Sequence, residues 1–433
     1  MTAPAQTGTI LDFYGAKADL GPPFKEGRPS THPLGVLYQA PWETAGDGFN
    51  EHSRRCARAL ALTGCPVLLR SFLPRVGVGF GEDAAIEQQM APLAGASIAR
   101  ASVHVCQAVL RGRTMLQNLV PSTHRFLEPE ELEASHRTKV VYSVWERDRI
   151  SAEDAGLLNK VAQVWTACRA NAAMLARSGV DEAKIRVVPI PFFPDDPMLA
   201  LAGRTRTPGP VRFYHIGKWE PRKAQDKLIL AFLRAFKPTE AILMLKTSEK
   251  GPKVDDYPET PMRAIHAALA DDAVKKNEWT VTNVGRGVIV IARQLPPKQI
   301  VELHRMGDVY VTLSRGEGFE MSGFDSKLAG NVMVYTPSGG PQDFASACDQ
   351  RVEPSGSIPC SPFYRWDADA RYLDYDIDEA VRAMQRSLTY ATLTHGPAAA
   401  RIQEDLAPFS AARVGQKMLG YLREVVGVEG RVY

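Results

Sequence analysis

Short apolar runs alternate with amphipathic stretches along most of this chain. The apolar run at 35–40 is followed by helical spacing over about 50–63, and a second apolar run begins at 66–69. The same order returns at 211–216, where a strand-like run precedes an amphipathic stretch at 226–236. Because each strand–helix–strand unit joins two parallel strands, this alternation predicts an α/β fold built on parallel sheets.

The other apolar runs extend the alternation into two series. Further strands are expected at 102–105, 140–144, 164–167, 242–245, 288–291, 309–313 and 332–335, and further helices at 152–161, 171–177 and 410–426. Residues 195–210 are rich in proline and polar residues, which is typical of an interdomain linker. The stretch 249–284 is polar and less regular, and we interpret it as an insertion.

A chain of 433 residues is longer than one ordinary hydrophobic core supports. We therefore expect two Rossmann-like, doubly wound parallel-sheet domains that face each other across a cleft. The expected parts are an irregular lead-in, an N-terminal domain, a C-terminal domain and a last helix that crosses back to the first domain, at 1–34, 35–205, 206–405 and 406–433.

Composition restricts the partners and the compartment. The formal net charge is only +3, which by itself supports neither a nucleic-acid nor a membrane partner. The six cysteines include no C-x-x-C pair, so we interpret them as reduced thiols in a cytoplasmic protein without a zinc site. No secretory leader is recognisable, and no apolar run reaches the roughly 18 residues that span a bilayer. Peripheral contact with a membrane stays open.

A glycine-bearing loop follows the expected strand at 309–313. Two carboxylates, Glu317 and Asp325, bracket this loop, which leads into a helix. In an α/β sheet ligands bind beyond the carboxyl ends of the strands, and the amides at a helix N-terminus suit an anion. The carboxylates are better suited to the hydroxyls of a ribose or a sugar.

A second loop, at 217–224, contains three cations. Lys218, Arg222 and Lys223 lie between the strand at 211–216 and the helix that follows it. Lysine is a compact and mobile donor, so Lys218 and Lys223 are candidates to hold a diphosphate. A solvated charged loop is the alternative interpretation.

These two loops together resemble the nucleotide-sugar domain of the family 4 retaining glycosyltransferases, which have the GT-B architecture. In the first loop the resemblance rests on Gly217, Lys218, Pro221 and Lys223, and Ala224 stands where the family usually has glycine. The resemblance extends over about 35–425.

In the second loop the family has a Glu-Gly-Phe-Gly segment and another glutamate eight positions after the first. Here the segment is 317–320, with Glu320 in place of the last glycine, and Asp325 is the second acid. The turn at 338–343 resembles another family segment.

The resemblance implies a role for each matching residue. Glu317 would lie beside the transferred sugar and Asp325 would bind the ribose, while Lys218 and Lys223 would stabilise the diphosphate. The backbone after Glu317 would reach the phosphates, and the residues concerned are Gly318, Phe319, Ser322, Gly323 and Phe324.

The N-terminal half matches the family more loosely. Gly46 and Gly48 stand where the family has a glycine-rich loop near the donor; an ordinary turn is the alternative. Glu146 follows a tryptophan, as in some members, and is a candidate for handling the acceptor hydroxyl; a surface ion pair is the alternative. Other members have a catalytic histidine in that region, which this chain lacks. We interpret His104 as a core or cleft histidine rather than a catalyst.

The implied activity is transfer of a hexosyl or pentosyl group from a nucleoside diphosphate sugar to a hydroxyl, with retention and without a metal or cofactor. The base of the donor and the class of acceptor stay open. An acceptor surface for phosphate-bearing lipid or nucleic acid could include Arg54, Arg55, Arg58, Arg111 and Arg113, and a solubilising helix face is the favoured alternative. The alternatives are a non-catalytic sugar- or nucleotide-binding protein and a transferase acting on modified nucleic-acid bases. A Rossmann dehydrogenase lacks support, because Glu51 stands where the third glycine of its motif is required.

Overall fold

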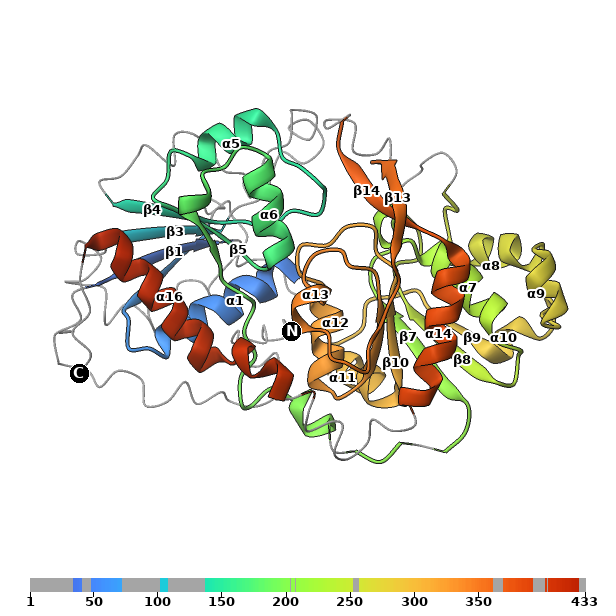
Figure 1. Ribbon diagram of the computed structural model, residues 1–433. Coiled ribbons are helices and arrows are strands. Elements are labelled where there is room, and N and C mark those ends of the chain that lie inside the picture. The colour runs from blue at the N-terminus through green and yellow to red at the C-terminus, as the bar shows by residue number, and fades with distance from the viewer. Residues whose placement is uncertain are drawn as a thin grey trace, which may run out of the picture. The chain divides into compact units, whose positions relative to one another are not determined.

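The computed structural model describes residues 34–40, 48–71, 102–107, 137–202, 204–206, 208–251, 257–360, 369–391, 402 and 404–427. The chain forms two compact units (Figure 1). Unit 1 comprises residues 1–145, 150–195 and 408–433, and unit 2 comprises residues 146–149 and 196–407. The second unit is therefore inserted into the sequence of the first. Among the described residues, no helix is both long and apolar enough to cross a membrane.

Unit 1 is built on a six-stranded parallel sheet with strand order β2-β1-β3-β4-β5-β6. Its strands are β1 (Val36–Ala40), β2 (Val67–Ser71), β3 (Val103–Gln107), β4 (Thr138–Tyr142), β5 (Gln163–Thr166) and β6 (Ile185–Val187). Its helices are α1 (Gly48–Ala61), α5 (Ala152–Leu158), α6 (Arg169–Arg177) and α16 (Ala411–Val426). The alternation read from the sequence is confirmed in this unit, although α5 is shorter than expected.

Helix α16 closes unit 1 by packing against α1 (Figure 1). Its apolar residues Val414, Met418 and Leu422 are buried. Gly415 allows the close approach, because a Cβ atom there would lie 2.3 Å from the carbonyl oxygen of Ala59.

Unit 2 contains a second six-stranded parallel sheet, with strand order β12-β11-β10-β7-β8-β9. Its strands are β7 (Val211–Ile216), β8 (Ala241–Lys246), β9 (Val288–Ile291), β10 (Val309–Thr312), β11 (Val332–Tyr335) and β12 (Gln350–Arg351). A separate antiparallel pair follows, formed by β13 (Pro354–Pro359) and β14 (Arg371–Tyr375).

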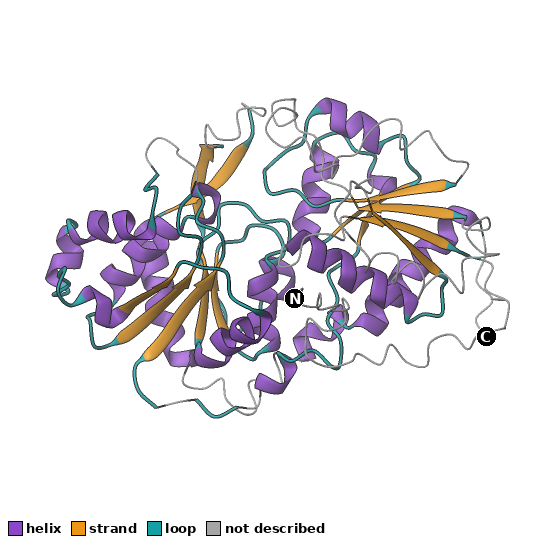
Figure 2. Ribbon diagram, turned by 180° about the vertical axis from the view of Figure 1, so that it is seen from behind, coloured by secondary structure: helices purple, strands orange, loops and turns teal. Residues whose placement is uncertain are grey.

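Helices cover both faces of this second sheet (Figures 1 and 2). They are α7 (Gln225–Ala235), α8 (Pro261–Leu269), α9 (Asp272–Lys276), α10 (Val284–Gly287), α11 (Pro297–Met306), α12 (Met321–Leu328), α13 (Pro341–Phe344) and α14 (Ile377–Ala391). On one face Phe213 of β7 packs against Phe232 and Phe236 of the α7 segment. On the other, the Tyr214 hydroxyl lies 2.9 Å from Nδ1 of His304 in α11.

One expectation for unit 2 was wrong. The stretch 249–284 is not an irregular insertion throughout, because α8 and α9 lie within it. Both helices have side-chain caps: Thr260 accepts from the amide of Arg263, and Asp271 accepts from the amides of Ala273 and Val274. Their polar residues form the outer faces of short amphipathic helices whose inner faces are buried.

Candidate functional site

The point where the strand order reverses in unit 2 lies between β7 and β10. The chain runs from β7 outward to β8 and β9, and then returns to place β10 on the other side of β7. Ligands in doubly wound sheets bind beyond the carboxyl ends of the strands at such a switch point. The loops that follow β7 and β10 are the two loops singled out in the sequence, and the amide of Arg315 donates to the carbonyl of Arg222 at 2.8 Å to join them.

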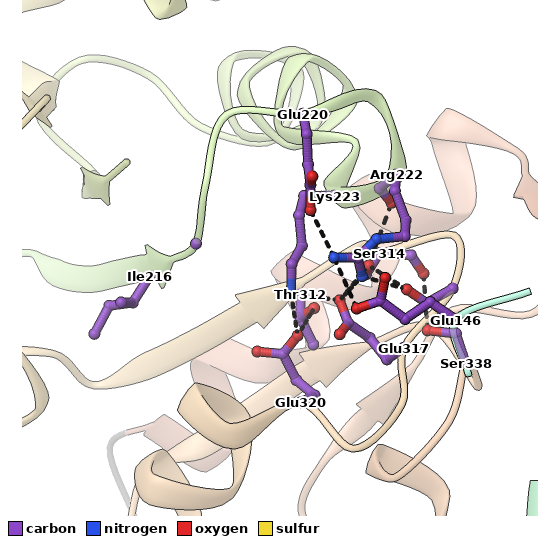
Figure 3. Close-up of polar contacts among 12 residues, drawn as sticks. Glu146, Ile216, Glu220, Arg222, Lys223, Thr312, Ser314, Glu317, Glu320 and Ser338 are labelled. Carbon is purple, nitrogen blue, oxygen red and sulfur yellow. Dashed lines mark hydrogen bonds and ion pairs between the residues drawn. The ribbon is translucent and has the colours of Figure 1, made fainter. Parts of the chain in front are cut away.

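Lys223 and Glu317 are paired at the centre of this junction (Figure 3). Nζ of Lys223 donates to Oε1 of Glu317 at 2.5 Å, and the hydroxyl of Ser314 donates to the same oxygen at 2.5 Å. Burial alone would raise the pKa of Glu317, but the charges of Lys223 and Arg222 lower that pKa to about 2. Glu317 is therefore a fixed anion with an ordered orientation.

Arg222 organises the carboxylates around the same point. Its guanidinium lies 2.6 Å from Glu220, 3.0 Å from Glu146 and 3.1 Å from Glu317. It also donates to the carbonyl of Gly316 at 2.7 Å. The sequence placed Arg222 in the cationic loop without a role, whereas the structure makes this buried side chain the main cation that holds the two loops together.

Glu320 is the second residue whose importance the sequence understated. Its Oε2 accepts from Nζ of Lys223 at 3.1 Å, and its Oε1 accepts from the hydroxyl of Tyr310 at 2.8 Å. Burial raises the pKa of Glu320; Lys223 lowers that pKa and the charge of Glu317 raises it again, so it is about 7. Lys223 thus contacts two buried carboxylates rather than an open site.

Two non-glycine residues at this junction have left-handed backbone conformations. Ala224 has φ of 48° and Glu320 has φ of 68°. These are the two positions where the resembling family has glycine, the residue that adopts positive φ without a steric penalty. This chain therefore keeps the left-handed backbone conformation at both positions although neither residue is glycine.

Lys218 differs from Lys223 in its surroundings. It is exposed, and the ends of β7 and β8 bring it near Lys246, whose pKa is lowered by burial and by the charge of Lys218. Gly217, beside it, lies so close to His215 that a Cβ atom would be 2.7 Å from the ring Nε2. The two lysines expected to hold a diphosphate therefore differ: one is accessible and the other is paired.

The first turn of α12 contains Ser322, Gly323 and Phe324, with Asp325 following in the same helix. Phe324 is fully buried, and its ring packs against those of Phe319 and Phe344. The aromatic side chains therefore anchor the loop, while the amides at the start of the helix are the groups suited to an anion.

The turn at 338–343 packs against the same loop. Gly339 has φ of 68°, and a Cβ atom there would lie 2.1 Å from the carbonyl oxygen of Glu317. At Gly340 a Cβ atom would lie 2.2 Å from the carbonyl oxygen of Phe319. The backbone at these two glycines therefore packs closely against the loop at 317–319.

The expected residues of the N-terminal half are only partly covered by the structure. Gly46, Arg111 and Arg113 lie outside the described residues, whereas Gly48 begins α1. Glu146 belongs to unit 2, where its side chain is 47% exposed and pairs with Arg222. His104 is buried, with Gln39 at 2.8 Å from one ring nitrogen and Lys139 at 2.8 Å from the other.

Two of the arginines that could have formed a basic face on α1 are engaged in other contacts. Arg55 is buried and pairs with Glu51 at 2.8 Å. Arg58 pairs with Asp195 at 2.9 Å and stacks on Phe193, 4.0 Å from the ring centroid. Because these arginines are engaged within unit 1, they do not form an open cationic surface together.

The described part of the chain holds a further cavity but no candidate metal site. No three His, Cys, Asp or Glu side chains come together there in a way that could hold a metal ion. A cavity of about 430 Å³ lies between β9 and α11, and its lining includes Arg293, Leu295 and Met306. None of Lys223, Arg222, Glu317 and Glu320 lines this cavity.

Comparison with solved structures identifies the fold of the chain. No family model and no curated protein sequence matches the chain. Solved structures do match. HepE of Anabaena in complex with UDP and glucose has a TM-score of 0.54 and 14% identity over 90% of this chain and 100% of that one. The chain has the GT-B fold.

Two further GT-B structures show similar agreement. Sucrose-phosphate synthase of Thermosynechococcus elongatus has a TM-score of 0.57 and 13% identity, covering 92% of this chain and 100% of that one. α,α-Trehalose 6-phosphate synthase of Burkholderia multivorans also has a TM-score of 0.57, with 11% identity over 92% of this chain and 99% of that one. At these identities the likeness shows the fold alone.

Proposed function

We propose that this protein is a glycosyltransferase that moves a sugar from a nucleoside diphosphate sugar to an acceptor hydroxyl, with retention and without a metal. The observation that carries the proposal is the cluster of Lys223, Arg222 and Glu317 at the switch point of a GT-B unit. The matched Anabaena HepE structures contain UDP, UDP with glucose, or UDP-glucose, which supports a nucleotide-sugar donor.

Each residue has a task in this proposal. Lys218 and Lys223 stabilise the diphosphate as negative charge develops on it, together with the amides at the start of α12. Glu317, ionised and oriented by Ser314, accepts hydrogen bonds from sugar hydroxyls. Asp325 binds the ribose. Preorganised groups of this kind each lower a barrier by about 3–4 kcal/mol.

Glu146 is the proposed contact of the acceptor hydroxyl. Its carboxylate is half-exposed and is held by Arg222, which also contacts Glu317. This arrangement puts an accessible acid beside the proposed sugar site. The leaving diphosphate can itself take the acceptor proton, so the mechanism does not require Glu146 as the base.

A thermal-shift panel of UDP-, GDP- and ADP-sugars tests the proposal, because a ligand that binds the native state raises its stability by mass action. Lys223→Ala is expected to remove most of the ligand-induced shift. Lys237→Ala is the matched control, since Lys237 is an exposed lysine of the same unit that pairs with Glu278. An unchanged shift in Lys223→Ala would place the diphosphate elsewhere.

Turnover decides between an enzyme and a binding protein. The pairing of Lys223 with both Glu317 and Glu320 is the observation that favours a non-catalytic protein, because it leaves this cation already compensated. Release of free nucleoside diphosphate in the presence of saccharide, lipid or nucleic-acid acceptors supports the transferase. A thermal shift without release from any donor supports the binding protein.

We also propose a cytoplasmic location. The six cysteines of the sequence include no C-x-x-C pair, a pattern that supports a reducing compartment. Exclusive recovery of the protein in a secreted or periplasmic fraction would contradict this proposal.

A further inference from the structure

Glu320 is a buried acid held in a strained backbone conformation. It precedes α12 with φ of 68°, and only 1% of its side chain is exposed. A left-handed conformation costs a non-glycine residue roughly 1–2 kcal/mol. Such conformations persist where the surroundings determine them and are concentrated at functional sites.

Hydrogen bonds from its neighbours hold the carboxylate of Glu320 in contact with Nζ of Lys223. Tyr310 donates to one oxygen at 2.8 Å. Lys223 donates to the other at 3.1 Å (Figure 3). Thr312 lies 3.5 Å from that second oxygen. Gly323 leaves the necessary space, because a Cβ atom there would lie 2.9 Å from Cγ of Glu320.

This placement conflicts with binding of a diphosphate at Lys223. Nζ of Lys223 already lies within 3.1 Å of two carboxylates, Glu317 and Glu320. A phosphate oxygen that approached Nζ would meet both negative charges at short range. Two like charges 4 Å apart repel by about 4 kcal/mol at the effective dielectric constant typical of protein sites. One of the two carboxylates must therefore become neutral or move away.

The charged and titratable groups around the pair identify which carboxylate changes. Glu317 stays ionised, because Lys223 and Arg222 hold its pKa at about 2 despite burial. His215 stays neutral, since burial lowers its pKa to about 4, and burial keeps the pKa of Tyr310 well above its usual value. The pKa of Glu320, at about 7, lies in the physiological range. Burial also raises the pKa of Glu146, against the charge of Arg222 that lowers it, so Glu146 is tested separately below.

We propose that a diphosphate binds at Lys223 together with one proton, which is taken up from solvent by the carboxylate of Glu320. The proposal rests on the proposed function, and it makes Glu320 a residue that sets donor affinity. Neutral Glu320 removes one negative charge from the cluster and leaves Lys223 able to contact a phosphate oxygen while still paired with Glu317.

The affinity for UDP-glucose, measured by calorimetry between pH 6 and pH 8, tests the inference. UDP-glucose is the chosen probe because its esterified diphosphate does not titrate in this range, unlike the terminal phosphate of UDP. With a pKa of about 7 the protonated fraction falls about tenfold between these pH values, so the dissociation constant is expected to rise about tenfold. Buffers of different ionisation enthalpy count the protons taken up, and the expected number at pH 8 approaches one.

Three variants separate Glu320 from its neighbours. Glu320→Gln keeps the shape of the side chain but cannot ionise, so its affinity should be independent of pH and about tenfold tighter than that of the wild type at pH 8. Glu320→Gly relieves the positive φ and should behave in the same way. Glu220→Gln removes a carboxylate that pairs with Arg222 and should keep the pH dependence.

The possible outcomes distinguish this inference from the proposed function. Binding that does not weaken with pH, or a pH dependence that survives in Glu320→Gln, overturns the inference and leaves the proposed function intact. A pH dependence that is lost instead in Glu146→Gln assigns the proton to Glu146 and also overturns the inference. Failure of every nucleotide sugar in the thermal-shift panel to bind either the wild type or Glu320→Gln at any of these pH values overturns both.

Discussion

Replacement of Lys223 by methionine removes a charge while keeping most of the length of the side chain. In the wild type, Nζ lies 2.5 Å from Glu317 and 3.1 Å from Glu320, and these carboxylates are 5% and 1% exposed. Lys223→Met would leave the two buried carboxylates facing each other with only Arg222 nearby, on the Glu317 side. Removing one partner from a buried ion pair destabilises a protein by about 3–5 kcal/mol.

The penalty is expected to depend on pH in a definite direction. Without Lys223 the pKa values of Glu317 and Glu320 rise, because the cation that lowers both is gone. The folded state then binds protons that the unfolded state, with its ordinary glutamates, releases above about pH 4.5. The free energy of unfolding of Lys223→Met therefore falls as the pH rises, so the loss relative to wild type is largest near pH 8 and smaller near pH 5.

Thermal unfolding followed by circular dichroism at pH 5, 6.5 and 8 measures this effect. For a unit of about 200 residues, 3–5 kcal/mol corresponds to a fall of roughly 6–20 °C in the unfolding midpoint. The double variant Lys223→Met/Glu320→Gln should recover part of the loss at pH 8, and Lys237→Met should leave the midpoint unchanged. A penalty that is equal at pH 5 and pH 8 would refute the interpretation of the cluster as two carboxylates that share one lysine.

Three other substitutions test the geometry around the cluster, each by equilibrium unfolding in urea. Gly339→Ala combines a positive φ with a 2.1 Å approach to the carbonyl of Glu317 and should cost at least about 2 kcal/mol, whereas Gly285→Ala has no atom within 4 Å and should not destabilise. Ala224→Gly should be tolerated at φ of 48°, while Ala224→Val should cost about 2 kcal/mol or more; equal stability of the two would contradict the assigned backbone conformation. Lys327→Met should cost about 3–5 kcal/mol because it leaves Asp349 buried without the cation that lies 2.7 Å away, and a loss below about 1 kcal/mol would show that water reaches this pair.

Much of the fold could be predicted from the sequence because the parallel strands are buried. The apolar runs that became β7, β8, β10 and β11 are short and bounded by polar residues, which is the pattern of strands covered on both sides. In the amphipathic stretch at 226–236 the apolar side chains of Leu228, Ile229, Phe232 and Phe236 are buried. The stretch 249–284 was misread, although Thr260-Pro261 is a recognisable helix start.

The candidate site could be predicted only in part. The loops that follow β7 and β10 could be predicted to lie next to each other, because the connectivity of a doubly wound sheet determines which loops meet at its carboxyl edge. The contact of Lys223 with Glu320 joins residues 97 positions apart and depends on a positive φ, which residue spacing does not encode. One feature of the sequence did point to these residues. Ala224 and Glu320 stand where the resembling family has glycine, and both have a left-handed backbone conformation.

The path of the chain through unit 1 has a consequence for how the molecule is made and how it can change. The chain leaves this unit near Phe192 and, after residues 196–407, re-enters it beside the same residue. The amide of Phe192 donates to the carbonyl of Phe409 at 3.0 Å, and the amide of Ala411 donates to the carbonyl of Phe192 at 2.8 Å. The main segment of unit 2, residues 196–407, is thus a single insertion that begins and ends next to paired residues of unit 1. Such an insertion can be exchanged for another without changing the rest of unit 1. Synthesis on the ribosome completes unit 2 before α16 has emerged, so the unit that is begun first is the one that finishes folding last.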